Sequence, residues 1–412
     1  MTTPPWAWPG IWAAVLCCSA GAPQAQPSLH PMHPATLGLE AAWARQPEQQ
    51  AAALRRDAIE AARRSAQRWT PAAPTLELSH RSDRTVRNDG QRELEATLAA
   101  PLWLPGERSR SHALADADAT LLEARLAAAR LKLAEQVRSS LWDQARAAQE
   151  LQLADARTSH ARRLADDVAR RLEAGDLAQA DAHQAQAALA AVQAGAAEAR
   201  AAATRTARRW HALTGLPPLA QEPPPEARPH DAEAASSHPE LRLLAARAAS
   251  AVRQRELAAS QQWPRPEVAI GTVRERSSPG QRFDQSIVVG VRVPLGGASD
   301  SAMRIATAAA EQTEAESALA IETRRIEGEL AAAKDLVVAL DLAAAAAQRR
   351  ATLAIESRGF FDKAFRLGQT DLPTRLRIEL EAFEAERQAA RSRIELSAAI
   401  SALRQALGQL PE

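Results

Sequence analysis

One short group of residues in the sequence has the chemistry to bind a metal ion. His30, Met32 and His33 lie in the run His-Pro-Met-His, and imidazole and thioether groups are ligands for soft or borderline metals. A flexible polar arm near the N-terminus is the alternative interpretation of these residues. The other histidines, such as His160, stand singly in helix-like sequence, where we expect them to be solvated.

Residue patterns typical of enzyme sites are absent from the sequence. It has no Ser-His-Asp arrangement, no phosphate-binding glycine loop and no Cys/His metal cluster. The neighbouring acids Asp166 and Asp167 fit a charged helix surface better than a pair of general acid and base. We therefore predict that the chain is not an enzyme and uses no cofactor.

The composition favours long helices over a packed globular core. Of the 412 residues only 3% are aromatic, none is tyrosine, and the apolar content comes mainly from Ala and Leu. Such residues allow helices to pack closely through small side chains. Charged residues make up 25% of the chain and nearly cancel to a net charge of +1, which gives no reason to expect nucleic acid as a partner.

The first residues, 1–26, are predicted to be a secretory signal. A short apolar core at 11–16 is followed by small residues at 19–22, and the core is too short to span a bilayer as a helix. The segment before this core has no Lys or Arg, so a misassigned start or a disordered tail is the alternative.

The only cysteines, Cys17 and Cys18, lie inside this segment. Cleavage near Ala25 leaves a mature chain without disulfides or thiolate metal sites. A lipid anchor on Cys18 is the competing interpretation, although the preceding residues match the lipid-attachment pattern poorly. No later stretch has the 18 or so consecutive apolar residues that a membrane helix needs, so a membrane-spanning form of this chain must use strands.

An internal repeat indicates the architecture. Three pairs of landmark residues are separated by the same 193 positions: Pro101 and Pro294, Gly175 and Gly368, and Gly215 and Gly408. A stretch with six prolines separates the two halves and reads as an extended linker. We therefore predict a first repeat at 27–215, a linker at 216–237 and a second repeat at 238–412.

Each repeat has the same predicted order of elements. A moderate helix comes first, at about 36–67 and 238–262, followed by two short strands and then a very long helix. Residues 107–173 contain no proline or glycine, and a helix of about 67 residues is about 100 Å long. With its counterpart at 298–367, it buries its apolar stripe only against other helices, which predicts a coiled-coil rod.

The predicted strands alternate with period two. Ile287, Val289, Val291 and Val293 form an apolar face, and Leu94, Ala96, Leu98 and Ala100 oppose Glu93, Glu95 and Thr97. Runs of about 9–11 residues suit tilted transmembrane strands. A small soluble β-subdomain packed on the helices is the alternative. Four strands leave two open edges, whereas three chains supply twelve strands that can close.

The predicted fold is therefore mainly α with a small β part. Each chain is expected to be a tandem-repeat, coiled-coil protomer of an α-barrel that contributes four strands to a trimeric twelve-stranded β-barrel.

In these features the sequence resembles the TolC family of outer-membrane efflux proteins, and within it the CzcC-like branch of heavy-metal efflux ducts. The resemblance is carried by the tandem units, by a Pro-Glu opening at Pro47 and Pro239, and by Pro-Leu after each strand pair. Each long helix also ends in a glycine-marked motif, at 175–181 and 368–372, and the first repeat closes with the run 213–217.

The resemblance implies a passive duct in the outer membrane of a Gram-negative bacterium that extends into the periplasm. It implies a homotrimer in contact with outer-membrane lipid. The expected partners are a periplasmic adaptor and an inner-membrane pump, often of the resistance-nodulation-division type. Family members export metal cations, drugs or solvents, and the sequence leaves the cargo open.

The resemblance also places a periplasmic tip at Gly175, Asp181, Phe365, Gly368, Thr370 and Asp371. Three copies of Asp181 would ring the aperture and favour cations, and an ordinary acid in the first turn of a helix is the alternative. Thr370 stands where some members carry arginine, so the sequence departs from an ionic lock there. Phe365 is either an aromatic constriction or a coiled-coil core residue.

The competing function is a periplasmic adaptor or structural coiled-coil protein without a membrane barrel. An adaptor normally carries a compact β-domain between the two helices of one hairpin. In this sequence each repeat has its strands before the long hairpin, which favours the duct.

Overall fold

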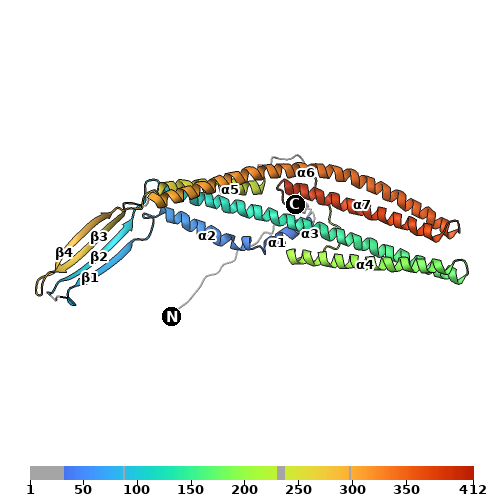
Figure 1. Ribbon diagram of the computed structural model, residues 1–412, viewed down its shortest axis with the longest axis horizontal. Helices are drawn as coiled ribbons and strands as arrows, with labels where there is room; N and C mark the ends of the chain where they lie inside the picture. Colours follow the sequence, from blue (N-terminus) through green and yellow to red (C-terminus); the bar gives the residue numbers. More distant parts are fainter. Residues whose placement is uncertain (1–31, 87–88, 230–236, 297) are drawn as a thin grey trace, which may run out of the picture. The chain divides into compact units, whose positions relative to one another are not determined.

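The computed structural model is mainly helical and contains one small sheet (Figure 1). It describes residues 32–86, 89–229, 237–296 and 298–412. The predicted signal at 1–26, both cysteines and His30 lie outside the described residues. Residues His33–Glu412 form one compact unit, separate from the residues that precede it.

The element order of the second half repeats that of the first, apart from one additional helix at the start. The first half contains α1 (Pro34–Trp43), α2 (Pro47–Gln67), β1 (Thr75–Ser82), β2 (Arg92–Pro101), α3 (Glu107–Glu173) and α4 (Gln179–Thr214). The second half contains α5 (Pro239–Ser260), β3 (Glu267–Arg276), β4 (Asp284–Arg292), α6 (Ala298–Arg366) and α7 (Leu372–Ala406).

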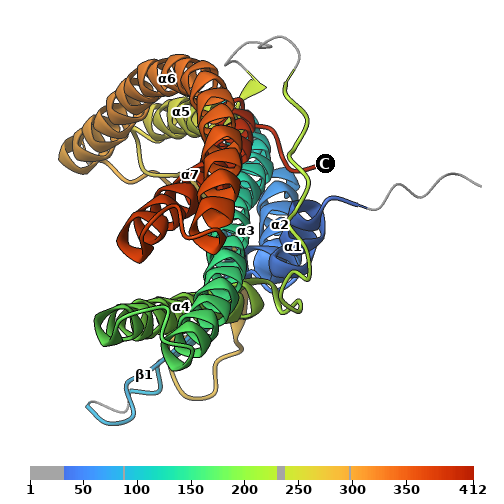
Figure 2. The same ribbon diagram turned by 90° about the vertical axis from the view of Figure 1, so that its right-hand side faces the viewer.

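Two long helical hairpins dominate the unit. Helix α3 pairs with α4 and α6 pairs with α7, while α3 also contacts α2, α5 and α7 (Figure 2). The long helices predicted at 107–173 and 298–367 are confirmed, and each ends where a glycine takes a positive φ. Alanine at many contact positions allows the backbones to approach closely.

The single helix predicted at about 36–67 is wrong. The chain forms α1 and α2 with a break at residues 44–46, because Pro47 cannot continue a helix from the preceding turn and instead occupies the first position of α2. Gly38 in α1 lies so close to the buried ring of Trp210 that a Cβ would be 2.6 Å from Cη2. The extra helix therefore docks on α3 and α4 through small residues.

The four strands form one antiparallel sheet in the order β1-β2-β3-β4. The two hairpins meet at the β2–β3 pair, where Leu98 lies opposite Ile270 and Ala96 opposite Thr272. Strands β1 and β4 are paired on one side only in the described chain. The predicted alternation of apolar and polar residues is confirmed. Directly opposite residues lie on the same face of the sheet, and the register places Leu98 and Ile270 together with Val289.

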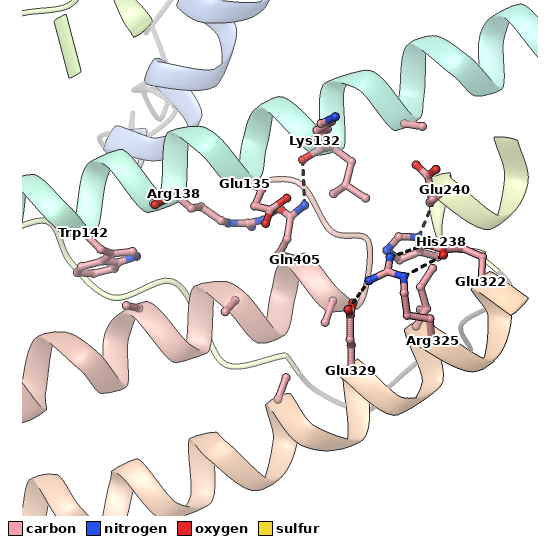
Figure 3. A pocket seen from close by; sticks show the side chains of 18 of the residues that line it. Lys132, Glu135, Arg138, Trp142, His238, Glu240, Glu322, Arg325, Glu329 and Gln405 are labelled. Atoms are coloured by element: carbon pink, nitrogen blue, oxygen red, sulfur yellow. Dashed lines mark hydrogen bonds and ion pairs between the residues drawn. The ribbon is translucent and has the colours of Figure 1, made fainter. Parts of the chain in front are cut away.

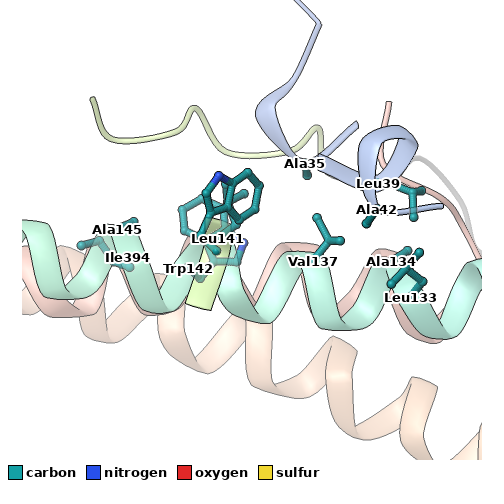
Figure 4. Packing of buried hydrophobic residues seen from close by; sticks show 11 residues of the cluster. Ala35, Leu39, Ala42, Leu133, Ala134, Val137, Leu141, Trp142, Ala145 and Ile394 are labelled. Carbon is teal, nitrogen blue, oxygen red and sulfur yellow. The ribbon is translucent and has the colours of Figure 1, made fainter. Parts of the chain in front are cut away.

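The largest apolar cluster lies where α1, α3, α4 and α7 meet (Figure 4). Figure 4 shows side chains of α1 and α3 facing one another, and Ile394 of α7 joins the same cluster. Its fully buried members include Val137 and Leu141 of α3 and Trp210 of α4, whose indole N–H donates to the carbonyl oxygen of Pro217 at 3.1 Å. The start of the linker is thereby fixed on the core.

A buried charge cluster attaches the linker to helices of both halves. The Glu226 carboxylate accepts hydrogen bonds from Nε and Nη2 of Arg138 in α3, at 2.9 and 2.7 Å. Arg404 of α7 lies 3.2 Å from the same carboxylate, and Arg138 also donates to the carbonyl oxygen of Gln409 at 2.9 Å. All three charged side chains are buried. We call Glu226, Arg138 and Arg404 the linker cluster.

The protonation of Glu226 follows from two opposing effects. Burial alone raises the pKa of a carboxyl group, but the hydrogen bonds and charge of Arg138 outweigh it and hold the pKa of Glu226 below its usual value. The carboxylate is therefore ionised at neutral pH and balances part of the buried positive charge.

Replacing Glu226 with Gln is expected to lower the free energy of unfolding by about 3–5 kcal/mol, because two guanidinium groups lose their buried counter-charge. Glu222→Gln is the matched control in the same linker, since its ion pair with Arg393 is partly exposed. That substitution should cost less than about 1 kcal/mol. Chemical denaturation of the full chain in detergent, followed by circular dichroism, measures both, and equal losses would contradict the account.

The difference between wild type and Glu226→Gln should also depend on pH. A carboxyl with a depressed pKa contributes its full stabilisation above its unfolded pKa, about 4.3, and loses it as pH falls through the folded value. The difference should therefore be largest near neutral pH and shrink in acid. A difference that stays constant between neutral pH and pH 3 would argue against this role of Glu226.

Candidate functional site

The turn between α3 and α4 is built around Gly175. Its φ of +84° lies in the left-handed region, and an added Cβ would meet nothing within 4 Å. Glycine is therefore required by the backbone conformation and not by crowding. The next helix begins after Ala178, whose side chain cannot cap it. Asp181, in the first turn of α4, makes the reciprocal bond of a capping box, because its carboxylate accepts a hydrogen bond from the Ala178 N–H at 3.1 Å.

The turn between α6 and α7 has the same backbone and a different cap. Gly368 has a φ of +71°, and Asp371 precedes the first residue of α7 and accepts a hydrogen bond from the Thr374 N–H at 3.1 Å. Hydrogen bonds from the side chain and then the backbone of Thr374 lower the pKa of Asp371. Asp371 is the repeat equivalent of Ala178. Each helix start therefore has one carboxylate, but Asp181 in the first repeat lies three residues later than the position equivalent to Asp371.

Phe365 joins the two hairpins just before the second turn. Its ring is 3% exposed and packs in a cluster with Leu164 and Val168 of α3 and Leu372 of α7. The guanidinium groups of Arg171 and Arg375 lie 5.1 and 4.8 Å from the ring centroid. This environment favours the interpretation as a core residue, since a buried ring cannot project into an aperture as a constriction.

Charged residues around this cluster are already paired. Asp362 forms ion pairs with Arg375 and, at 2.8 Å, with Arg366, while Arg171 lies 3.3 Å from Asp167. Thr370 is half-buried and Asp371 is exposed in the second turn. The two turns, residues 174–178 and 367–371, therefore present glycine backbone and capping groups, with the hairpins held together behind them.

The sheet has two chemically different faces. We define the apolar face by the side chains that the register places together and that are exposed in the chain: Leu76, Leu78, Leu94, Leu98, Ile270, Ile287, Val289 and Val291. Leu76 is 64% and Ile287 is 75% exposed. An apolar band of this extent on a folded chain indicates a surface that meets lipid or another protein.

The opposite side, the polar face, is acidic. Its charged residues are Glu77, Glu93, Glu95, Glu267, Glu275, Asp284, Arg81 and Arg292. Arg81 pairs with Glu93 at 3.0 Å and Arg292 with Glu267 at 3.4 Å, while Glu275 and Asp284 lie directly opposite one another. Six carboxylates and two arginines leave an excess of negative charge on this face.

A groove of about 750 Å³ lies between α3, α6, α7 and the start of α5 (Figure 3). Arg325 forms ion pairs with Glu322 and Glu329, and the hydrogen bond from Arg325 lowers the pKa of Glu322. His238 caps α5 by accepting the Glu240 N–H at 3.2 Å, and burial lowers its pKa. In the groove, Arg325, Glu322 and Glu329 are therefore engaged with one another, and His238 is engaged with the start of α5.

His33 has both ring nitrogens engaged. Nδ1 accepts from the Ala35 N–H at 3.2 Å and caps α1, while Nε2 lies 2.8 Å from the carbonyl oxygen of Pro224. In this geometry neither nitrogen is open to a metal ion. Within the described residues no three His, Cys, Asp or Glu side chains are grouped as metal ligands.

Of the helices described, none is apolar enough over a sufficient length to cross a membrane.

Comparison with known proteins shows which fold the chain shares and which family model matches part of it. The fold is that of outer-membrane channel proteins, and residues 38–216 match the family model described as outer membrane efflux protein. No curated protein matches the sequence.

Several solved structures share the fold over most of their length. The outer membrane protein VceC from Vibrio cholerae has 17% sequence identity, with 92% of this chain and 97% of that chain covered and a TM-score of 0.73. CusC has 15% identity, coverage of 91% and 92%, and a TM-score of 0.74. The MtrE outer membrane channel from Neisseria gonorrhoeae has 14% identity, coverage of 91% and 88%, and a TM-score of 0.70. The predicted fold class is confirmed.

Some important residues gave no local signal in the sequence. Arg138, Glu226 and Arg404 resemble the many other charged residues of the chain, and only long-range contacts bring them together. The acidic polar face could have been found from the alternation of Glu93 and Glu95 with Leu94 and Ala96, which the sequence does show.

Phe365→Ala is expected to lower the free energy of unfolding by about 3–5 kcal/mol, since it empties the cluster that joins the hairpins. Phe360→Ala is the matched control on the same helix, because that ring is 73% exposed. Its effect should be within about 0.5 kcal/mol of wild type in the detergent-solubilised monomer. If the denaturation curves of the two variants coincide, the assignment of Phe365 to the core is contradicted.

Proposed function

We propose that the chain is one protomer of a homotrimeric outer-membrane channel that serves a tripartite efflux system. The observation that carries the proposal is the sheet, which combines an exposed apolar face, an acidic polar face and two unpaired edges at one end of long helical hairpins. The family match over residues 38–216 and the shared fold support it.

The two sheet edges require that more than one chain contributes to the barrel. In hydrocarbon every backbone N–H and C=O must be paired, and a four-stranded sheet leaves the outer groups of β1 and β4 open. Joining β1 of one chain to β4 of the next closes a ring when three chains contribute twelve strands. The apolar face then lies toward lipid and the polar face toward the lumen.

The helical part extends this duct through the periplasm. We infer two repeats, 27–215 and 238–412, joined by the linker 216–237 after removal of the signal at 1–26. The turns containing Gly175, Gly368, Thr370 and Asp371, with Asp181 in the first turn of α4 and Phe365 behind them, form the periplasmic tip. A periplasmic adaptor and an inner-membrane pump dock there, and the duct itself performs no chemistry.

The cargo we propose is cationic. Three copies of the polar face place eighteen carboxylates and six arginines around the lumen, and a ring of acidic side chains favours cations. Metal cations and cationic drugs both meet this requirement, and the resemblance to heavy-metal ducts makes metal the first choice. A deletion strain tested against zinc, cobalt, cadmium, copper and organic drugs distinguishes them.

Joining of the edges can be tested by cysteine crosslinking. Ser79 on β1 and Ser286 on β4 both lie on the polar face, and the chain has no cysteine outside residues 17 and 18. The double variant Ser79→Cys/Ser286→Cys, with neighbouring positions scanned for register, should give covalent trimers in outer-membrane fractions under oxidation. Each single variant is the control and should give none. Recovery of the protein in the soluble periplasm without detergent would support the adaptor hypothesis instead.

Selectivity should depend on the acids of the polar face. Replacing Glu95, Glu275 and Asp284 with Gln, Gln and Asn should lower the ratio of potassium to chloride permeability of the reconstituted channel by severalfold. The charge-conserving variant Glu95→Asp/Glu275→Asp should keep the wild-type ratio. Reversal potentials in planar bilayers measure it, and an unchanged ratio in the neutralised variant would exclude these residues as the source of selectivity.

A further inference from the structure

Three arginines gather at the end of the apolar face that adjoins the hairpin turns. Arg92 on β2 lies directly opposite Arg276 on β3. Arg274 lies on the same face of β3, two residues before Arg276 and further from the turn. The apolar side chains Leu94 and Ile287 come next on the neighbouring strands. We call Arg92, Arg274 and Arg276 the arginine cluster.

Within the described residues, none of these three arginines forms an ion pair with a carboxylate. Like charges directly opposite in a sheet are destabilising. The nearby acids Glu93 and Glu275 alternate onto the polar face, where Glu93 already pairs with Arg81.

One atom of the cluster also lacks a hydrogen-bond partner. Nε of Arg276 is buried and makes no hydrogen bond within the described structure. A buried donor without an acceptor is costly, so such a group points to a ligand that supplies one. An anion lying between Arg92 and Arg276 would satisfy this donor and relieve the repulsion between the two guanidinium groups.

The surroundings identify the kind of anion. The guanidinium carbons of Arg274 and Arg276 lie 4.8 and 5.0 Å from the ring centroid of Phe283, which is 39% exposed. An aromatic ring and arginines next to an apolar band are typical of the interface between hydrocarbon and headgroups. Planar guanidinium forks match the oxygens of a phosphate.

We propose that the arginine cluster binds a phosphate of an anionic lipid headgroup in the outer leaflet of the membrane. This inference rests on the proposed function, which places the apolar face in lipid. The hairpin turns lie at the end of the sheet away from the helices (Figure 1), so the cluster is at the external headgroup level, where phosphorylated glycolipids are found.

The test measures binding of diphosphoryl lipid A to the purified full chain in detergent, by native mass spectrometry. Arg92→Gln/Arg276→Gln should bind at least about tenfold more weakly than wild type. Arg81→Gln/Arg292→Gln, which removes the same charge from the polar face, should bind as wild type does. Should the first variant fail to form the wild-type oligomer, Arg92→Lys/Arg276→Lys keeps the charge and loses the fork, and it should bind more weakly than wild type.

Three results would overturn the proposal. The first is equal binding of lipid A by wild type and the Arg92→Gln/Arg276→Gln variant. The second is an equal loss in the polar-face variant, which would indicate a general effect of charge. The third is displacement of lipid A by millimolar inorganic phosphate, which would indicate a site for free anions.

Fractionation of the same cells separates this inference from the proposed function. If the protein forms a trimer in the outer membrane but its binding of lipid A does not depend on the arginine cluster, only the lipid site is overturned. Absence from the outer membrane overturns both.

Discussion

The unpaired backbone groups of β1 and β4 are the constraint on which the structure depends. The sheet carries strongly exposed leucine, isoleucine and valine on one face, and such a face is stable in hydrocarbon only if no edge remains open. A protomer with four strands cannot satisfy this condition alone. In the proposed channel, assembly from several chains and the separation of an acidic lumen from a lipid-facing surface both follow from that requirement.

A second constraint acts on the helical part, because the two similar halves must keep one relative position along very long helices. Glu226 brings a buried carboxylate from the linker to Arg138 of the first half and Arg404 of the second. A buried ion pair adds little net stability compared with apolar packing, but breaking it leaves uncompensated charge, so it enforces one arrangement. At the far end of the hairpins Phe365 performs the same function through apolar contacts.

Much of this architecture could be predicted from the sequence because the determining signals are local. Period-two alternation located the strands and their faces, and the positive-φ glycines at 175 and 368 marked the turns. The break before Pro47 was missed, although the proline itself is a local signal. The linker cluster and the Arg92–Arg276 pair depend on which segments meet in space, and no periodicity in one chain encodes that.

Electron cryomicroscopy of the purified full chain in lipid nanodiscs would show directly whether β1 and β4 of neighbouring chains pair. We expect a threefold-symmetric particle in which twelve strands close into one barrel with the apolar face toward lipid. A monomeric particle, or an assembly in which β1 and β4 of neighbouring chains remain unpaired, would contradict it.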